Sequence, residues 1–205
     1  MSLKNHEDCH LKDDTIITQY KIALACHLIV FVFEKQMGRL EIVLLDKDGF
    51  RSNVAIVLGD GMGKVFWAKR IGQSAWQFPQ GGVDYKESVE QALYRELYEE
   101  IGLTAEDVSV VQRTRRWLRY KIPPNLRRNT GSDVCIGQKQ KWFFLKLTSN
   151  EEKIRFDVTR EPEFDDWRWV TFWHPLKSVV AFKKGVYRAA LKEFYLKNSH
   201  MQRSR

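Results

Sequence analysis

Three glutamates at helical spacing are the residues of this 205-residue chain best suited to chemistry. Glu96, Glu99 and Glu100 lie in a segment whose apolar residues recur at helical intervals. On a helix that turns about 100° per residue, Glu96 and Glu100 fall on or beside the apolar stripe that should face the core. A carboxylate buried there must be protonated, paired with a cation or bound to a metal ion. Carboxylates converging from positions i, i+3 and i+4 suit Mg²⁺ or Mn²⁺, which prefer oxygen ligands.

A second interpretation is that these acids form surface salt bridges with the many nearby arginines. Arg95 can reach Glu99, one turn further along the predicted helix. The preceding glycine-rich segment favours a binding site, because Gly81 and Gly82 allow the backbone to approach a metal ion and its phosphate closely.

The elements that must position these acids are predicted from periodicity and turn residues. Helices are predicted over residues 86–101 and 184–197, and Gly102 is expected to end the first. The predicted strands cover residues 54–58, 65–68, 108–120, 139–147 and 167–172. Strands with one internal and one terminal helix predict a single mixed α/β domain.

Two glycine-containing segments connect these elements. Residues 59–64 are predicted to form a hairpin turn, because they lack the spacing and the following helix that a phosphate-binding loop needs. Residues 77–82 contain Pro79 and a glycine pair, which predicts a loop in which the backbone turns sharply.

The charge of the chain is positive and unevenly distributed. The net charge is +8, with seven basic and no acidic residues in 111–130, and seven basic residues against one acid from residue 183 onward. Such a surface attracts nucleic acid, nucleotide phosphates or anionic lipid, although a basic protein without such a partner is an equal alternative. The apolar run 22–33 is too short to span a membrane. The three cysteines are widely spaced, which favours the cytoplasm.

The chain is predicted to have three parts. Residues 1–46 form an N-terminal extension of unknown role, which could be an extra strand, a poorly ordered extension or sequence upstream of the natural start. Residues 47–198 form the main domain, and residues 199–205 form a basic C-terminal tail.

The segment around the acids resembles the sequence motif of the Nudix hydrolase family. Over 23 residues, the match comprises Gly81, Glu87, Arg95-Glu96-Leu97, Glu99-Glu100 and Gly102-Leu103. The resemblance implies a Nudix-type α/β/α sandwich with a mixed β-sheet. It also implies that Glu96, Glu99 and Glu100, with Gly81, bind Mg²⁺ or Mn²⁺, which activate water to attack a nucleoside diphosphate linked to another group.

Further segments are similar to the RNA pyrophosphohydrolases of bacteria, a branch of that family. They are 76–82, 117–120, 135–143, 162–165 and much of 167–187. The resemblance implies that a cytoplasmic enzyme converts 5′-triphosphate (or diphosphate) RNA ends to 5′-monophosphates, which promotes mRNA decay. It implies 5′-triphosphorylated RNA as the partner, and neither a membrane nor an obligate protein partner.

Two other functions stay open at this stage. Dinucleoside polyphosphate hydrolases, of the diadenosine tetraphosphate type, resemble several of the same segments. An RNA-binding module without activity is the third interpretation, and the intact set of glutamates argues against it.

The resemblance also implies roles for residues outside the motif. Glu163 matches a position that helps to bind metal or handle a proton, whereas without the resemblance it would be an ordinary exposed loop acid. The residues expected to bind substrate are Arg51, Arg70, Arg119, Tyr120, Gln138, Lys139, Lys141, Val180, Phe182 and Lys183. Val180 and Phe182 are expected to hold a nucleobase near the 5′ end. Ala75 stands where a related enzyme carries a serine near that base, and the loss of the hydroxyl is expected to relax the preference for the second nucleotide.

Overall fold

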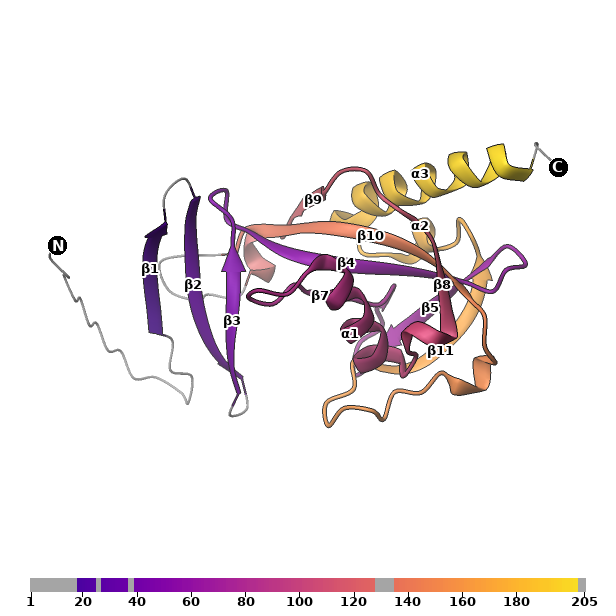
Figure 1. Ribbon diagram of the computed structural model, residues 1–205, viewed down its shortest axis with the longest axis horizontal. Coiled ribbons are helices and arrows are strands. Elements are labelled where there is room, and N and C mark those ends of the chain that lie inside the picture. The colour runs from indigo at the N-terminus through magenta and orange to yellow at the C-terminus, as the bar shows by residue number, and fades with distance from the viewer. Residues whose placement is uncertain (1–17, 25–26, 37–38, 128–134, 203–205) are drawn as a thin grey trace, which may run out of the picture.

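The computed structural model is an α/β/α sandwich, and it describes residues 18–24, 27–36, 39–127 and 135–202 (Figure 1). Side chains are described for residues 45–127 and 135–197. The helices are α1 (Val89–Ile101), α2 (Pro175–Ser178) and α3 (Lys184–Gln202). The strands are β1 (Thr18–Leu24), β2 (His27–Gln36), β3 (Arg39–Leu45), β4 (Phe50–Gly59), β5 (Lys64–Arg70), β6 (Trp76–Gln77), β7 (Gln80–Gly82), β8 (Val108–Arg113), β9 (Leu118–Lys121), β10 (Gly137–Leu147) and β11 (Phe164–Thr171).

The centre of the sheet is a parallel pair of long strands. β4 and β10 run side by side from the Phe50–Gly137 pair to the Gly59–Lys146 pair. Strands β3, β5 and β7 pair with β4 in the antiparallel sense, and β8 and β9 do so with β10. Because the sheet contains both senses of pairing, the predicted mixed sheet is confirmed.

The two faces of the sheet are buried by different helices (Figure 1). Val54, Ile56 and Leu58 of β4 belong to the core cluster on the α1 side. The alternate residues Ala55 and Val57 belong to the cluster on the α3 side. A strand buried on both faces is apolar without alternation, which explains the continuous apolar run that marks β4 in the sequence.

The hairpin predicted over residues 59–64 is confirmed. β4 ends at Gly59 and β5 begins at Lys64. The Asp60 carboxylate accepts hydrogen bonds from the backbone N–H groups of Met62 and Lys64, at 2.7 and 3.0 Å. A short acid that bonds to the backbone two residues further on is a turn-forming feature, not a phosphate site.

Helix α1 ends where predicted but begins three residues later, at Val89. The Ser88 hydroxyl accepts a hydrogen bond from Gln91 N–H at 3.1 Å, and the Gln91 side chain accepts one from Ser88 N–H at 2.8 Å. This capping box starts the helix at Val89. Gly102 ends it with a left-handed backbone, at φ 74°.

The strand predicted over residues 108–120 is wrong as a continuous element, because the chain bends between β8 and β9. Both strands pair with β10, but at separate stretches of it. Between them, Arg115 N–H donates to the Glu193 carboxylate of α3 at 2.9 Å, which takes the backbone away from the sheet. The partner of this bond lies 78 residues away, so local sequence could not indicate it.

Part of the predicted N-terminal extension forms three antiparallel strands. β1 pairs with β2, β2 with β3, and β3 meets β4 at the Leu45–Arg51 pair. The extension therefore continues the sheet beyond β4 (Figure 1). The division of the chain into extension, main domain and tail stays a prediction, and residues 1–17 and 203–205 lie outside the described residues. Within the described chain, no helix is long and apolar enough to cross a membrane.

Removal of the helix cap should weaken the fold measurably. We expect Ser88→Ala to lower the free energy of unfolding by about 1 kcal/mol, because the Gln91 N–H loses its partner. Urea unfolding of Ser88→Ala and of the control Ser88→Asp, which keeps a capping oxygen, measures the effect. Equal losses in both variants would contradict the assignment of this cap.

Candidate active site

Two of the three predicted acids are buried together on one face of α1. Glu96 is 8% exposed and Glu100 is 6% exposed, whereas the Glu99 side chain is 37% exposed. The helical phase predicted for Glu96 and Glu100 is therefore confirmed. These two carboxylates lie where an ordinary helix would bury apolar side chains.

The backbone of β7 lies directly against these two acids. A Cβ atom on Gly81 would lie 1.9 Å from the Glu96 carboxyl carbon, so no larger residue fits without displacing Glu96. One residue earlier, Gln80 N–H donates to Glu100 Oε2 at 2.7 Å. The sharp loop predicted over 77–82 is wrong in part, because residues 80–82 form a short strand paired with β4. The glycine is required there by close approach, and its φ is not positive.

Arg95 is the centre of a network at the outer side of the acids. Its guanidinium donates to Glu87 at 2.8 Å, Glu96 at 2.7 Å, Glu99 at 2.9 Å and the carbonyl oxygen of Gly82 at 2.7 Å. The hydrogen bonds that Arg95 donates to Glu87 are the main reason that the Arg95 pKa is raised above its usual value. The predicted reach of Arg95 to Glu99 is confirmed.

The same network links Glu99 to Glu96, because Arg95 Nη1 donates to both carboxylates. The expectation that Glu96, Glu99 and Glu100 converge on one point is not met, because Glu96 and Glu100 are buried together whereas Glu99 is more exposed. Over the part of the chain with described side chains, no three acidic, histidine or cysteine side chains lie close enough to hold a metal ion by themselves.

The electrostatics of the buried acids indicate an excess of negative charge. Burial raises the pKa of Glu100 well above its usual value, and the charges of Glu163 and Glu96 raise it further. Burial also raises the pKa of Glu96 to about 7, although the neighbouring Arg95 opposes this shift. Both carboxylates therefore favour a proton or an additional cation at this place.

Glu163 lies in a loop, as predicted, and faces the same acids. Its side chain is 45% exposed and lies 3.5 Å from the Arg70 guanidinium. Its backbone carbonyl accepts a hydrogen bond from Ile71 N–H at 3.0 Å, which fixes the loop to the end of β5. Glu163 is thus an accessible acid beside two buried ones.

Lys183 supplies a buried positive charge on the other side of β7. Its ammonium donates to the side-chain oxygens of Gln77 and Gln80 at 3.1 and 3.2 Å. Burial and the nearby charge of Arg70 lower its pKa to about 8. Gln80 therefore joins the two halves of the site, with its N–H on Glu100 and its side chain on Lys183.

Several of the predicted substrate residues surround Lys183. The Tyr120 hydroxyl donates to the Gln138 side chain, and the Lys183 ammonium lies 5.9 Å from the Tyr120 ring. The Phe182 ring lies 5.8 Å from that of Tyr120. Val180 follows α2, precedes Phe182 by two residues and is 39% exposed.

The remaining predicted substrate residues have other contacts. Arg119 and Lys139 pair with Asp46, the last residue of the predicted extension, at 3.5 and 3.0 Å. Lys141 donates to the carbonyl oxygen of Arg115 at 3.0 Å. The structure therefore does not bring these three cations to the buried acids. The end of Arg51 lies against Gly82, where a Cβ would be 2.4 Å from its Nη2.

Sequence reasoning missed the two glutamines that connect the site. The position of Gln80 in the sequence could have indicated its role. Gln80 directly precedes Gly81, whose backbone lies against the Glu96 carboxylate, so its own backbone must lie near the acids. The side chain of Gln77 meets Lys183 across 106 residues of sequence, and no local pattern indicates that contact.

Comparison with known proteins points to the same region. A family model described as a NUDIX domain matches residues 49–190. The RNA pyrophosphohydrolase of Aliivibrio fischeri (strain MJ11) is 58% identical over 151 residues, which cover 74% of this chain and 89% of that protein. The RNA pyrophosphohydrolase of Ectopseudomonas mendocina is 57% identical over 150 residues, which cover 73% of this chain and 94% of that protein.

Two solved structures share the fold. The dihydroneopterin triphosphate pyrophosphohydrolase of E. coli gives a TM-score of 0.57 at 21% identity, and covers 72% of this chain and 98% of its own. A C. elegans Ap4A hydrolase gives a TM-score of 0.52 at 19% identity, with the same coverage of both chains. At these identities the likeness concerns the fold alone.

Loss of the Arg95 guanidinium should destabilise the protein. We expect Arg95→Ala to lower the free energy of unfolding by about 3 kcal/mol, because it leaves part-buried carboxylates and the Gly82 carbonyl without their donor. The control is Arg113→Ala, which removes an exposed ion pair with Glu90 and should cost less than about 1 kcal/mol. Urea unfolding measures both, and similar losses would refute the central role of Arg95.

Proposed function

Because the chain belongs to the Nudix hydrolase family, we propose that it is an RNA 5′-pyrophosphohydrolase. The proposed reaction converts the 5′-triphosphate or diphosphate end of RNA to a 5′-monophosphate, promotes mRNA decay and takes place in the cytoplasm. The observation that carries the proposal is the 57–58% identity, over about three quarters of the chain, to proteins named RNA pyrophosphohydrolase.

The buried acids fit a divalent cation of the kind that Nudix hydrolases use. Glu96 and Glu100 offer carboxylate oxygens. Burial, together with repulsion from neighbouring carboxylates such as Glu163, raises their pKa values, which a nearby divalent charge would offset. We propose Mg²⁺ or Mn²⁺, held by Glu96, Glu100, the Gly81 backbone and Glu163. A bound ion would neutralise phosphate charge and lower the pKa of the attacking water. Glu99, which shares the Arg95 guanidinium with Glu96, is the further carboxylate that we propose for this set.

The residues around these acids are suited to a polyphosphate. Arg70 and Lys183 place two positive charges on the side of the site that faces Glu163 and Glu100. A guanidinium and an ammonium there attract the phosphates and orient the bond to be broken. Glu163, as the exposed acid of the set, is the residue we assign to proton transfer or to completing the metal site.

The aromatic residues beside Lys183 are suited to a nucleobase. The Tyr120 and Phe182 rings lie 5.8 Å apart, next to the half-exposed Val180. Aromatic faces stack with any base, which agrees with an RNA end as the substrate.

The role of the buried acids can be tested by neutralising one of them. We expect Glu100→Gln to lower kcat by at least about a hundredfold, because a ligand of the metal is lost. Without divalent ions its unfolding temperature should be equal to or higher than that of the wild type. The amide, like the protonated carboxyl that burial favours there, carries no charge, and Gln80 N–H keeps an acceptor.

The matched control is Glu90→Gln, which changes an exposed acid of the same helix. Its activity should equal that of the wild type. If Glu100→Gln hydrolyses at the wild-type rate, the metal-site assignment is wrong.

The substrate class is tested by direct comparison of rates. We expect kcat/KM for a triphosphorylated oligoribonucleotide to exceed that for diadenosine tetraphosphate by at least about tenfold. Mass analysis of the products should show pyrophosphate or phosphate and a 5′-monophosphate RNA. A preference for the dinucleotide would instead support the dinucleoside polyphosphate hydrolase.

A further inference from the structure

A hollow of about 290 Å³ lies between β9 and the start of α3, outside the cluster of acids. Its lining comprises Leu118, Arg119, Tyr120, Lys121, Phe182, Gly185, Val186 and Ala189. On the helix side the hollow is lined by the small residues Gly185 and Ala189. Ala189 is exposed, and a Cβ atom on Gly185 would meet no atom within 4 Å. The hollow therefore has room for a chain that lies along α3.

One end of the hollow adjoins the proposed active site. Tyr120 and Phe182 line this end, and the Lys183 ammonium lies 5.9 Å from the Tyr120 ring. Lys183 donates to Gln80, whose N–H donates to Glu100. Tyr120 and Phe182 therefore lie between the hollow and the contacts that lead through Lys183 and Gln80 to Glu100.

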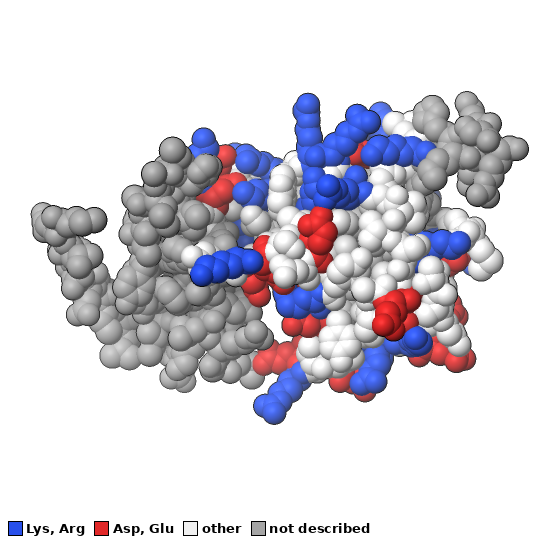
Figure 2. Space-filling view, viewed as in Figure 1, with Lys and Arg blue, Asp and Glu red and all other residues white. Residues whose placement is uncertain are grey.

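The other end is flanked by positive charge. Arg115 N–H bonds to Glu193 of α3, so the bend before β9 lies beside the helix near Lys192. Arg115, Arg116 and Lys192 are all exposed. Within the described side chains, no acid forms an ion pair with any of these three, and Glu193 is already bonded to the Arg115 backbone. Lys and Arg side chains gather on this upper surface in Figure 2.

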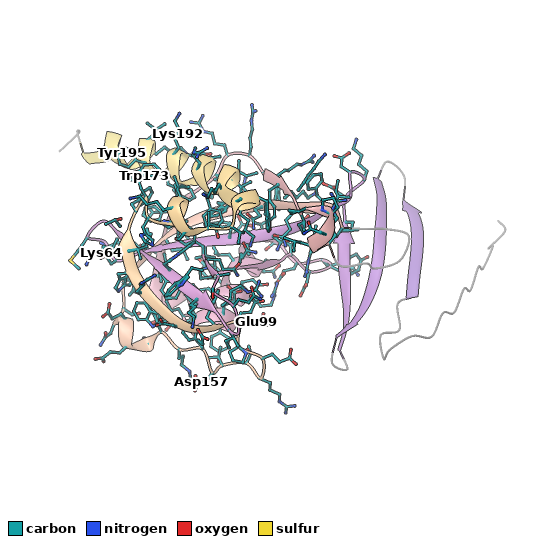
Figure 3. The ribbon with its side chains drawn as sticks, turned by 180° about the vertical axis from the view of Figure 1, so that it is seen from behind. Lys64, Glu99, Asp157, Trp173, Lys192 and Tyr195 are labelled. Carbon is teal, nitrogen blue, oxygen red and sulfur yellow. The ribbon has the colours of Figure 1, made fainter. Side chains whose placement is uncertain are left out.

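The positive end lies away from the acids. Lys192 projects from α3, while Glu99 lies on α1 across the sheet (Figure 3). From Gly185 to Lys192 the helix rises about 10 Å. The hollow and its basic end, which we call the β9–α3 groove, therefore continue the site without forming part of the cluster of acids.

We propose that the β9–α3 groove binds the single-stranded RNA that follows the 5′ nucleotides. This inference rests on the proposed function. In the groove, Arg116 and Lys192 contact the downstream phosphates, and an unstacked base enters the hollow beside Leu118 and Ala189. A single strand fits, because bases stacked within a duplex cannot enter such a hollow.

The test uses the double variant Arg116→Gln/Lys192→Gln and a 5′-hydroxyl oligoribonucleotide of about ten nucleotides. This probe lacks the 5′ phosphates, so fluorescence anisotropy reports on the groove alone. We expect binding on the order of tenfold weaker at low salt, with a shallower salt dependence. The control Lys64→Gln/Lys177→Gln removes two exposed charges from β5 and α2 and should bind like the wild type. Equal binding by both double variants overturns the proposal.

A second pair of variants tests the hollow itself. Ala189→Glu should weaken binding of the same probe, whereas Ala189→Lys should not, because the two side chains have similar reach and opposite charge. Equal effects of the two substitutions contradict an anionic strand in the groove.

Hydrolysis separates this proposal from the proposed function. With a triphosphorylated RNA of about ten nucleotides, the Arg116→Gln/Lys192→Gln variant should have a KM raised on the order of tenfold and an unchanged kcat. With a triphosphorylated dinucleotide, both constants should match the wild type. An equal KM increase on both substrates overturns the groove. If the wild type hydrolyses neither RNA, the proposed function fails instead, while the binding test with the 5′-hydroxyl probe still decides the groove.

Discussion

Two carboxylates of α1 are buried against the backbone of β7, and the rest of the site is arranged around that constraint. Glu96 touches Arg95, and Glu100 accepts the N–H of Gln80. Neither contact offsets the effect of burial, which is the main reason that both pKa values are raised, with neighbouring carboxylates adding to it. Gly81 follows from the same constraint, since a side chain there would occupy the position of the Glu96 carboxylate. Carboxylates are costly to bury without a cation. Their burial here is therefore consistent with membership of a hydrolase family that uses divalent cations.

The site joins the two sides of the sheet through a short strand. The Gln80 N–H reaches the acid on α1, while its side chain reaches Lys183 beside α3. The carboxylate that would hold a cation and the ammonium that would contact phosphates are therefore both bonded to the same residue, Gln80. This separation of charge allows one site to hold both the cation and the polyanion, and the excess of basic residues over the rest of the chain favours an RNA substrate.

Local geometry determined which features could be predicted from the sequence. The helical period of the segment predicts the burial of Glu96 and Glu100. The continuous apolar run of β4 predicts a buried strand, and the structure buries that strand on both faces. The partner of Glu99 among the nearby cations and metal sites could not be predicted. Several carboxylates lie within reach of Arg95, and only the folded structure shows that Glu99 is one of those it bonds. Lys141 also depends on a distant contact, with the Arg115 carbonyl. The sequence could indicate a cluster of acids, but not which acids share it.

The most direct test of the central claim is the anomalous scattering of manganese in crystals soaked with Mn²⁺. The account predicts a peak at coordination distance from both Glu96 and Glu100, about 2.1–2.2 Å from their oxygens. The contradictory result is the absence of a peak, with Glu96 still bonded to Arg95 and Glu100 to Gln80. In that case the two acids would be structural, and the hydrolase mechanism derived from them would be wrong.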